Sequence, residues 1–248
     1  MFDFYTYGLF AYFCFDMTER PLLYIMCALS TLILMTVGYL LGSINTSIII
    51  SRIFFGEDVR NYGSGNAGAT NVLRTYGKKS AVLTLLGDVL KTVIAVIAGR
   101  FIGFPIMFAA AYGEVLYGVS FAEYIAALFC VIGHTYPVYY KFKGGKGVLC
   151  AATAIAILSP ITFVALFAIF LIIVIGTKFV SLGSVIAVMA YPLLLHKMEG
   201  TSICTILAMM IAALVVYNHR TNIKRLLEGK ENKISIGKKD KEKNGGNK

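Results

Sequence analysis

The chain has 248 residues, of which 58% are hydrophobic and 15% are charged. Ordinary soluble domains carry about 25% charged residues, so the composition excludes that class and predicts one all-α, polytopic membrane domain. The net charge of +10 does not indicate a nucleic-acid-binding protein, because the basic residues gather at the ends of apolar segments and in the C-terminal tail. The five cysteines lack metal-ligand spacing, so we expect buried thiols and no metal site.

The first predicted membrane span follows an aromatic N-terminal extension. Residues 1–20 lack the basic start of a signal peptide, so we expect them to be retained as an external extension. Residues 21–51 contain no charged side chain, whereas about 20 apolar residues suffice to cross a bilayer. We therefore expect one long helix that crosses the membrane and projects beyond it.

The second span is expected over residues 80–99 and contains Asp88 and Lys91. These side chains are one turn apart and should share one face of the helix. Ionisable side chains at membrane depth usually face the protein interior or a water-filled cavity. The sequence leaves open whether this pair supports helix packing or belongs to a functional site.

Between these two spans lies a glycine-rich stretch, residues 60–74, reading RNYGSGNAGATNVLR. Glycines let the backbone approach a ligand closely, and hydroxyl, amide and guanidinium groups supply donors, which together predict a phosphate site. A flexible linker is the alternative. A dinucleotide site is excluded despite the G-x-G-x-x-G spacing, because no strand precedes it. The candidate residues here are Gly63, Ser64, Gly65, Asn66, Thr70, Asn71 and Arg74.

The remaining spans are expected at 124–140, within 147–177, at 179–196 and at 200–218, with 101–123 as an external or re-entrant connection. Residues 147–177 are uncharged but are interrupted by Ser159-Pro160, and we interpret them as two spans. That interpretation places 19 Lys and Arg residues on one side of the membrane and three on the other. Because basic residues favour the cytoplasmic side, it predicts seven transmembrane helices with the N-terminus outside and the C-terminus in the cytoplasm.

Three further polar clusters are predicted to share the cytoplasmic side with the glycine-rich stretch. The first contains Gly144, Gly145 and Lys146, and its glycines are expected to expose N–H groups beside the lysine charge. The second contains Ser181 and Ser184, which could instead bond to their own backbone. The third contains His219 and Asn222, three residues apart on one helix face. His134 is interpreted as a structural residue at the membrane interface.

Three stretches, in this order, resemble those of the bacterial acyl-phosphate:glycerol-3-phosphate acyltransferases, the PlsY family. They read GSGNAGATN from residue 63, GHTYP followed by FKGGKG from residue 133, and HRTNIKRLL from residue 219. The similarity covers about residues 39–231. It implies a seven-helix enzyme of the bacterial cytoplasmic membrane, expected to span residues 21–231. The basic and polar composition of residues 232–248 predicts a disordered cytoplasmic tail. The functional residues carried over by motif position are Ser64, Arg74, Lys146, Ser184, His219 and Asn222.

The resemblance implies transfer of a fatty acyl group from acyl phosphate to the 1-hydroxyl of glycerol 3-phosphate. The products are lysophosphatidic acid and phosphate, and no metal or cofactor is required. Ser64, His219 and Asn222 are the expected catalytic residues, whereas the other candidates bind substrate. Membrane lipid and an enzyme that forms acyl phosphate are the expected partners, and nucleic acid is not. The alternative is a transporter or lipid-flipping protein with a cytoplasmic phosphate site, although no internal repeat is visible.

Overall fold

The structure is a computed structural model that describes residues 20–103, 120–200 and 203–234, without the side chains of residues 20–24. The expected external extension, most of the connection at 101–123 and most of the C-terminal tail lie outside the described residues. Every regular element among the described residues is helical, which agrees with the predicted all-α class.

The first half of the described chain contains the helices α3 (Arg20–Ser43), α4 (Thr46–Phe55), η1 (Val59–Asn61), α5 (Ala69–Tyr76), α6 (Lys78–Ile102), α8 (Phe121–Thr135) and η2 (Val138–Tyr140). The second half contains α9 (Val148–Leu158), α10 (Pro160–Thr177), α11 (Val180–Glu199), α12 (Ile203–Asn218) and α13 (Arg220–Leu227).

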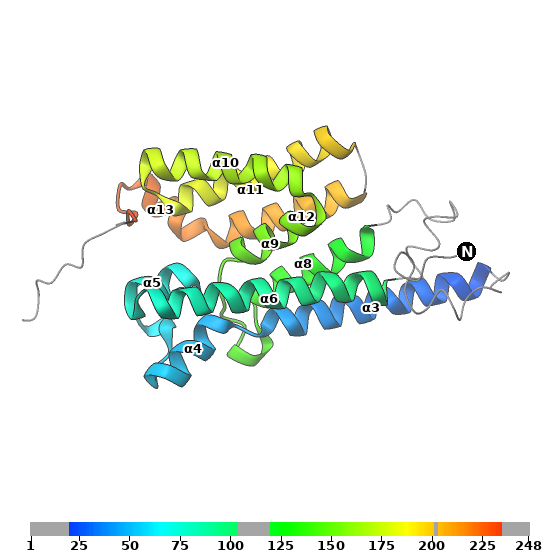
Figure 1. Ribbon diagram of the computed structural model, residues 1–248, viewed down its shortest axis with the longest axis horizontal. Helices are drawn as coiled ribbons and strands as arrows, with labels where there is room; N and C mark the ends of the chain where they lie inside the picture. The colour runs from blue at the N-terminus through cyan, green and yellow to red at the C-terminus, as the bar shows by residue number, and fades with distance from the viewer. Residues whose placement is uncertain (1–19, 104–119, 201–202, 235–248) are drawn as a thin grey trace, which may run out of the picture.

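The long helices form two groups that lie side by side (Figure 1). Helices α3, α6 and α8 pack against one another, and α10, α11 and α12 form the second group. Helix α9 contacts α6, α8 and α10, and α12 contacts α8, so these two helices join the groups. The short helices α5 and α13 lie at the same end of the bundle (Figure 1).

Close packing of α3 on α8 depends on glycine. A Cβ atom added to Gly42 would lie 2.1 Å from the Cys130 carbonyl oxygen, and one added to Gly133 would lie 2.1 Å from the Tyr39 carbonyl oxygen. Small residues at such crossings let two backbones approach within van der Waals distance, which is the main attraction between helices in a membrane. A side chain at either position would therefore separate α3 from α8.

The predicted single helix over residues 21–51 is wrong in one respect. The structure ends α3 at Ser43 and begins α4 at Thr46, so the uncharged run contains a break. Asn45 causes the new start, because its side-chain oxygen accepts a hydrogen bond from the Ile48 N–H and caps α4. The predicted division at Ser159-Pro160 is present, since α9 ends at Leu158 and α10 begins at Pro160.

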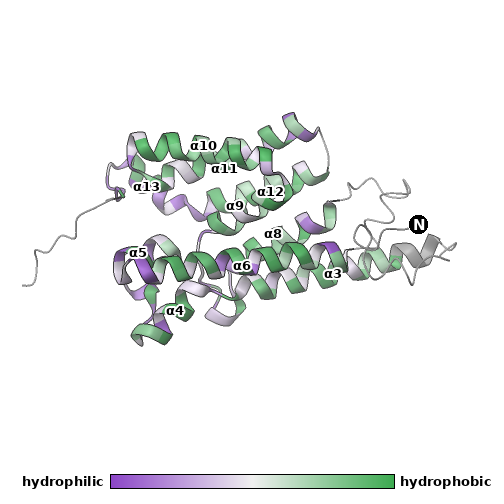
Figure 2. Ribbon diagram, in the orientation of Figure 1, coloured by the Kyte–Doolittle hydropathy of each residue, from purple (hydrophilic) through white to green (hydrophobic). Residues whose placement is uncertain are grey.

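The described helices are those of a multi-pass membrane protein. Five segments of the described chain are long and apolar enough to cross a membrane; one of them contains α3 and α4, and another contains α8 and η2. The bent pair α12–α13 would make a sixth if it acts as one span. Helix α9 has only 11 residues, short of the roughly 20 that a span requires. Apolar residues cover most of α6 and α10, and hydrophilic residues gather around α5 (Figure 2). The number of crossings and the side of each terminus remain predictions.

Candidate active site

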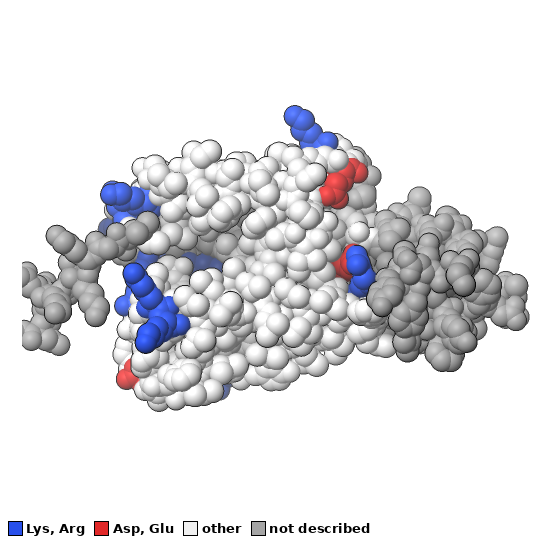
Figure 3. All heavy atoms as spheres, viewed as in Figure 1, with Lys and Arg blue, Asp and Glu red and all other residues white. Residues whose placement is uncertain are grey.

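A cavity of about 460 Å³ lies between the two helix groups. The surface is hollowed between α10 and α6, and atoms of Lys or Arg residues lie inside the hollow (Figure 3). One part of its wall is polar and comes from α5, the loop before α9, and the region around α13. The other part is apolar and includes Ile155, Phe163, Leu166 and Phe167. A cavity with these two surfaces can hold a molecule that has a charged head and an aliphatic tail.

Most of the residues predicted from the sequence come together at this cavity. Nine of them line it: Ser64, Asn66, Thr70, Asn71, Arg74, Lys146, Ser184, His219 and Asn222. The other four, Gly63, Gly65, Gly144 and Gly145, belong to the same loops but are not part of the lining. The lining also includes Asp88, His134, Arg225, Glu231 and Asn232, none of which was assigned to the site from the sequence.

Four helices begin at or beside the cavity. The first residues of α5, α9 and α11 line it, and His219, which precedes α13, lines it too. None of these four helices has a side-chain cap at its N-terminus. The first N–H groups of a helix have no partner within the helix, and the helix dipole adds positive potential there. The polar end of the cavity is therefore suited to an anion such as phosphate.

Asn71 holds the glycine-rich stretch in shape. Its side-chain oxygen accepts a hydrogen bond from the Ser64 N–H at 2.8 Å, and its amide nitrogen donates to the Val59 and Tyr62 carbonyls at 3.0 and 2.9 Å. Gly63 has φ of +59°, and a Cβ there would lie 2.2 Å from the Asn71 oxygen. Asn71 also lines the cavity, so its contact with substrate stays a prediction, and its amide atoms hold the loop and position Ser64.

Arg60 ties the glycine-rich stretch to the loop that carries Lys146. Its guanidinium pairs with the Asp58 carboxylate at 2.7 Å and donates to the Tyr140 and Lys143 carbonyls at 3.0 and 2.8 Å. The hydrogen bond from Arg60 is the main reason why the pKa of Asp58 lies well below its usual value. Arg60 therefore joins two loops, whereas Arg74 lines the cavity.

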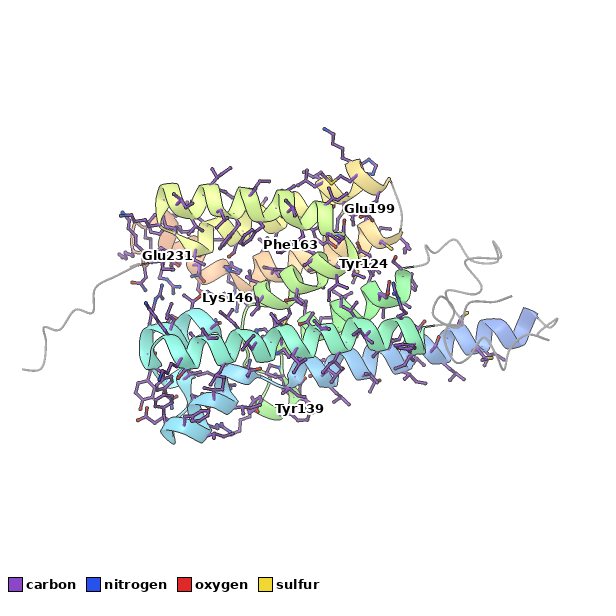
Figure 4. The ribbon with its side chains drawn as sticks, in the orientation of Figure 1. Tyr124, Tyr139, Lys146, Phe163, Glu199 and Glu231 are labelled. Carbon is purple, nitrogen blue, oxygen red and sulfur yellow. The ribbon has the colours of Figure 1, made fainter. Side chains whose placement is uncertain are left out.

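Lys146 belongs to a chain of polar contacts that ends at Glu231. Its ammonium donates to the side-chain oxygen of Asn222, and the Asn222 amide donates to Glu231 Oε1 at 2.6 Å. Arg225 pairs with the other Glu231 oxygen at 2.8 Å. Figure 4 shows Lys146 and Glu231 at one end of the bundle and Tyr124 and Glu199 toward the other.

The environment changes the pKa of both Lys146 and Glu231, the two ends of this series of contacts. Burial lowers the pKa of the Lys146 ammonium to about 8, and Glu231 opposes that change. Burial alone would raise the pKa of the Glu231 carboxyl, but hydrogen bonds from Arg225, Asn222 and Ser181 hold it below its usual value. At neutral pH the cavity thus contains an ammonium group near a carboxylate that already accepts hydrogen bonds from an amide, a guanidinium and a hydroxyl group.

Ser181 and Ser184 both line the cavity but differ in their hydrogen bonds. The Ser181 hydroxyl donates to Glu231 at 2.8 Å, whereas the Ser184 hydroxyl donates to the Val180 carbonyl of its own helix at 2.9 Å. Ser184 therefore keeps its oxygen lone pairs for other donors, while Ser181 helps to hold Glu231.

His219 is 2% exposed and has a defined orientation. Its Nδ1 lies 2.7 Å from the Val215 carbonyl oxygen, which can only accept, so Nδ1 is the donor. In the neutral ring Nε2 then carries a lone pair. That nitrogen can accept a hydrogen bond or a proton from a substrate hydroxyl.

The glycine–lysine loop differs from the expectation. The N–H groups of Gly144 and Gly145 were predicted to face an anion, but they donate to the Thr135 and His134 carbonyls at 3.1 and 3.0 Å. A Cβ on Gly145 would lie 2.2 Å from His134 Nε2. The two glycines therefore allow the loop to pack directly on the end of α8, and Lys146 supplies the charge. His134 is 4% exposed and lines the cavity, so it is more than an interface residue.

Within the described residues, no group of three or more His, Cys, Asp or Glu side chains could hold a metal ion.

Known proteins are similar to this chain in sequence and in fold. A glycerol-3-phosphate acyltransferase of Clostridioides difficile (strain 630) is 41% identical over 209 residues, which cover 83% of this chain and 96% of that protein. One of Syntrophotalea carbinolica is 42% identical over 202 residues, or 82% of this chain and 96% of that protein.

A crystal structure of PlsY, an integral membrane glycerol 3-phosphate acyltransferase, in its glycerol 3-phosphate form has a TM-score of 0.70 and 37% identity. The lysophosphatidic acid form of PlsY has a TM-score of 0.67 and 35% identity, and each covers 83% of this chain and 96% of the solved chain. The model of the glycerol-3-phosphate acyltransferase family matches residues 32–229. The chain belongs to the glycerol-3-phosphate acyltransferase family.

Proposed function

We propose that the protein transfers a fatty acyl group from acyl phosphate to the 1-hydroxyl of glycerol 3-phosphate. The observation that carries the proposal is the cavity itself. Its polar end combines uncapped helix N-termini with Lys146 and Arg74, and its other wall is apolar. This combination suits the phosphate and the aliphatic chain of one donor molecule.

In the proposed mechanism, Lys146, Arg74 and the helix N-termini bind phosphate, and Ser64 orients the acyl phosphate. His219 Nε2 accepts a hydrogen bond from the attacking hydroxyl of glycerol 3-phosphate, next to Asn222. The hydroxyl oxygen forms a bond to the acyl carbonyl carbon, and the bond from that carbon to the phosphate oxygen breaks. Phosphate leaves with the hydroxyl proton, which gives lysophosphatidic acid and inorganic phosphate. The site contributes positioning and charge stabilisation.

The acyl chain is proposed to enter from the side, between α6 and α10. Leu85 on α6 and Phe167 on α10 both line the cavity, and they are 39% and 46% exposed. Ile155 and Leu166 line the cavity as well and are each 5% exposed. This gradient of exposure supports an entrance facing lipid and a more enclosed apolar wall for the chain.

We further propose seven membrane crossings in the bacterial cytoplasmic membrane, with the cavity on the cytoplasmic side and the C-terminus in the cytoplasm. Support comes from the cluster of basic residues at the cavity end of the bundle. Residues 21–231 would form the membrane domain, with residues 1–20 outside and residues 232–248 as a cytoplasmic tail. An enzyme that makes acyl phosphate would supply the donor.

The test uses purified protein in detergent with glycerol 3-phosphate and either acyl phosphate or acyl-CoA. We expect lysophosphatidic acid from acyl phosphate and none from acyl-CoA. If lysophosphatidic acid forms with acyl-CoA but not with acyl phosphate, the donor assignment is contradicted. The rival transporter is tested in parallel with vesicles that contain the protein. Movement of glycerol 3-phosphate into vesicles without turnover in detergent would favour the transporter.

A further inference from the structure

A buried cluster of three ionisable side chains lies behind the glycine–lysine loop. Lys91 and Asp88 on α6 and His134 on α8 are 4%, 2% and 4% exposed. Lys91 Nζ lies 2.8 Å from Asp88 Oδ1 and 2.9 Å from His134 Nδ1. The structure thus confirms that Lys91 and Asp88 pair on one helix face, and it adds His134, which the sequence did not connect with them.

Lys91 also binds the backbone at the junction between α3 and α4. Its ammonium donates to the carbonyls of Gly42 and Ile44 at 3.1 and 2.8 Å, where α3 ends before α4. The three ammonium hydrogens serve four acceptors, namely His134 Nδ1, Asp88 Oδ1 and the two carbonyls, so one hydrogen is shared. An ammonium has no lone pair, so His134 Nδ1 can only accept from it. The proton of the neutral His134 ring is therefore on Nε2. Lys91 consequently fixes the orientation and the tautomer of the imidazole.

His134 in turn supports the loop that carries Lys146. Its carbonyl accepts the hydrogen bond from Gly145, and its ring lies so close to Gly145 that no Cβ could fit between them. Lys146 is the next residue along the chain and lines the cavity. A rotation of the imidazole would displace the Gly145 backbone, and Lys146 would move with it.

We propose that Lys91 is a positioning residue of the acyl-transfer site. It orients His134, His134 holds the Gly144-Gly145 backbone, and the loop places Lys146 in the cavity. The inference rests on the proposed function, because it gives Lys146 the role of binding a substrate phosphate. Lys91 does not need to contact substrate in order to act in this way.

A matched control exists on the same helix. Arg100 pairs with Glu123 at 2.9 Å, and Glu123 is 5% exposed, so this ion pair also neutralises a buried carboxylate. Neither Arg100 nor Glu123 lines the cavity. Lys91→Met and Arg100→Met each remove one cation of α6 and leave one buried carboxylate unpaired. Only Lys91→Met also removes the hydrogen bond that orients the His134 ring.

The first experiment measures hydrogen exchange of the full-length protein in detergent and needs no substrate. Lys91→Met is expected to increase exchange in peptides that contain Gly144 and Gly145, because the loop loses the fixed imidazole against which Gly145 packs. Arg100→Met is expected to leave those peptides unchanged. Unchanged exchange in Lys91→Met, or an equal increase in both variants, would overturn the inference.

The second experiment is a double-mutant cycle with Lys146→Ala, measured as kcat/KM for acyl transfer. Residues that act through one network are coupled, commonly by a factor of about two to about 150, whereas independent effects multiply. Lys91→Met is expected to lower kcat/KM about tenfold or more when Lys146 is present, and less than about twofold in the Lys146→Ala background. Effects that multiply would mean that Lys91 acts only through general stability, which contradicts the proposal.

Two further variants separate the remaining explanations. In Asp88→Asn/Lys91→Met no buried carboxylate is left unpaired, so full recovery of kcat/KM would assign the effect to that charge and overturn the role of His134. If Lys91→Met does not fold, His134→Gln takes its place in both experiments, since it removes the ring beneath Gly145.

If the wild-type protein has no acyltransferase activity, the proposed function fails. The exchange experiment then still decides whether Lys91 holds the loop, and binding of glycerol 3-phosphate replaces kcat/KM in the cycle.

Discussion

Replacing Lys146 by alanine should reduce activity strongly without unfolding the protein. The ammonium of Lys146 is held by Asn222 at the polar end of the cavity, which Arg74 and Arg225 also line. A hydrogen bond between a charged donor and phosphate is commonly worth about 1.5–3 kcal/mol. If that stabilisation acts in the transition state, the rate should fall by about tenfold to about 150-fold. The assay is the initial rate of phosphate release from acyl phosphate in the presence of glycerol 3-phosphate, per amount of folded protein.

Lys178→Ala is the matched control for this prediction. Lys178 is a lysine at the end of α10, is exposed, and does not line the cavity. Its replacement should leave the rate nearly unchanged, because it removes the same charge outside the site. An equal loss of rate in both variants, or a normal rate in Lys146→Ala, would show that the lysine of the glycine–lysine loop is only a basic residue at the membrane border.

Three other predictions follow from the geometry of the site. Burial lowers the pKa of Lys146 to about 8 in the protein without substrate, so its charge is present below that pH and lost above it. The wild-type kcat/KM should therefore fall as the pH rises through 8, whereas Lys146→Arg should not show this fall. Identical pH profiles of the two proteins would contradict the assignment. Gly145→Ala should abolish activity because its Cβ would meet His134 Nε2 at 2.2 Å, while Gly176→Ala, with no atom within 4 Å of the added Cβ, should be silent in the same assay. Asn71→Ala removes three hydrogen bonds of the glycine-rich stretch and should lower both the Tm and the rate, and an unchanged Tm would mean that the loop does not depend on it.

The sequence was sufficient to predict the helical class and the convergence of the polar clusters. Uncharged runs indicate the long helices, and basic residues at their ends are the basis for predicting that the loops share one side of the membrane. The break between α3 and α4 was missed, because Ile44 and Asn45 lie within an uninterrupted uncharged run. The available signal was Asn45 before Thr46-Ser47, since asparagine is a favoured N-cap. The prediction of one helix relied on the length of the uncharged run and did not consider Asn45 as the cap of a second helix.

Contacts between residues far apart in the sequence were harder to predict than the polar clusters themselves. Glu231 accepts a hydrogen bond from Ser181, which lies 50 residues earlier in the chain, and Lys91 bonds to His134, which lies 43 residues later. Such pairs depend on how α6, α8, α11 and α13 pack, which local spacing does not determine. The glycines of the glycine–lysine loop were correctly singled out, but their reason was different. They permit close packing on His134, whereas the sequence alone suggested that their N–H groups faced an anion.

Chemical labelling of Lys146 tests most directly whether the cavity is the substrate site. Because burial lowers its pKa to about 8, Lys146 should react with an amine-acylating reagent near that pH more readily than an ordinary lysine. Saturating glycerol 3-phosphate and inorganic phosphate should protect Lys146 from labelling, as measured by mass spectrometry, and activity should be lost in proportion to the labelled fraction. Lys178 should be labelled equally with and without these ligands. Labelling of Lys146 that ligands do not reduce, or that leaves acyl transfer intact, would contradict the assignment of the active site to this cavity.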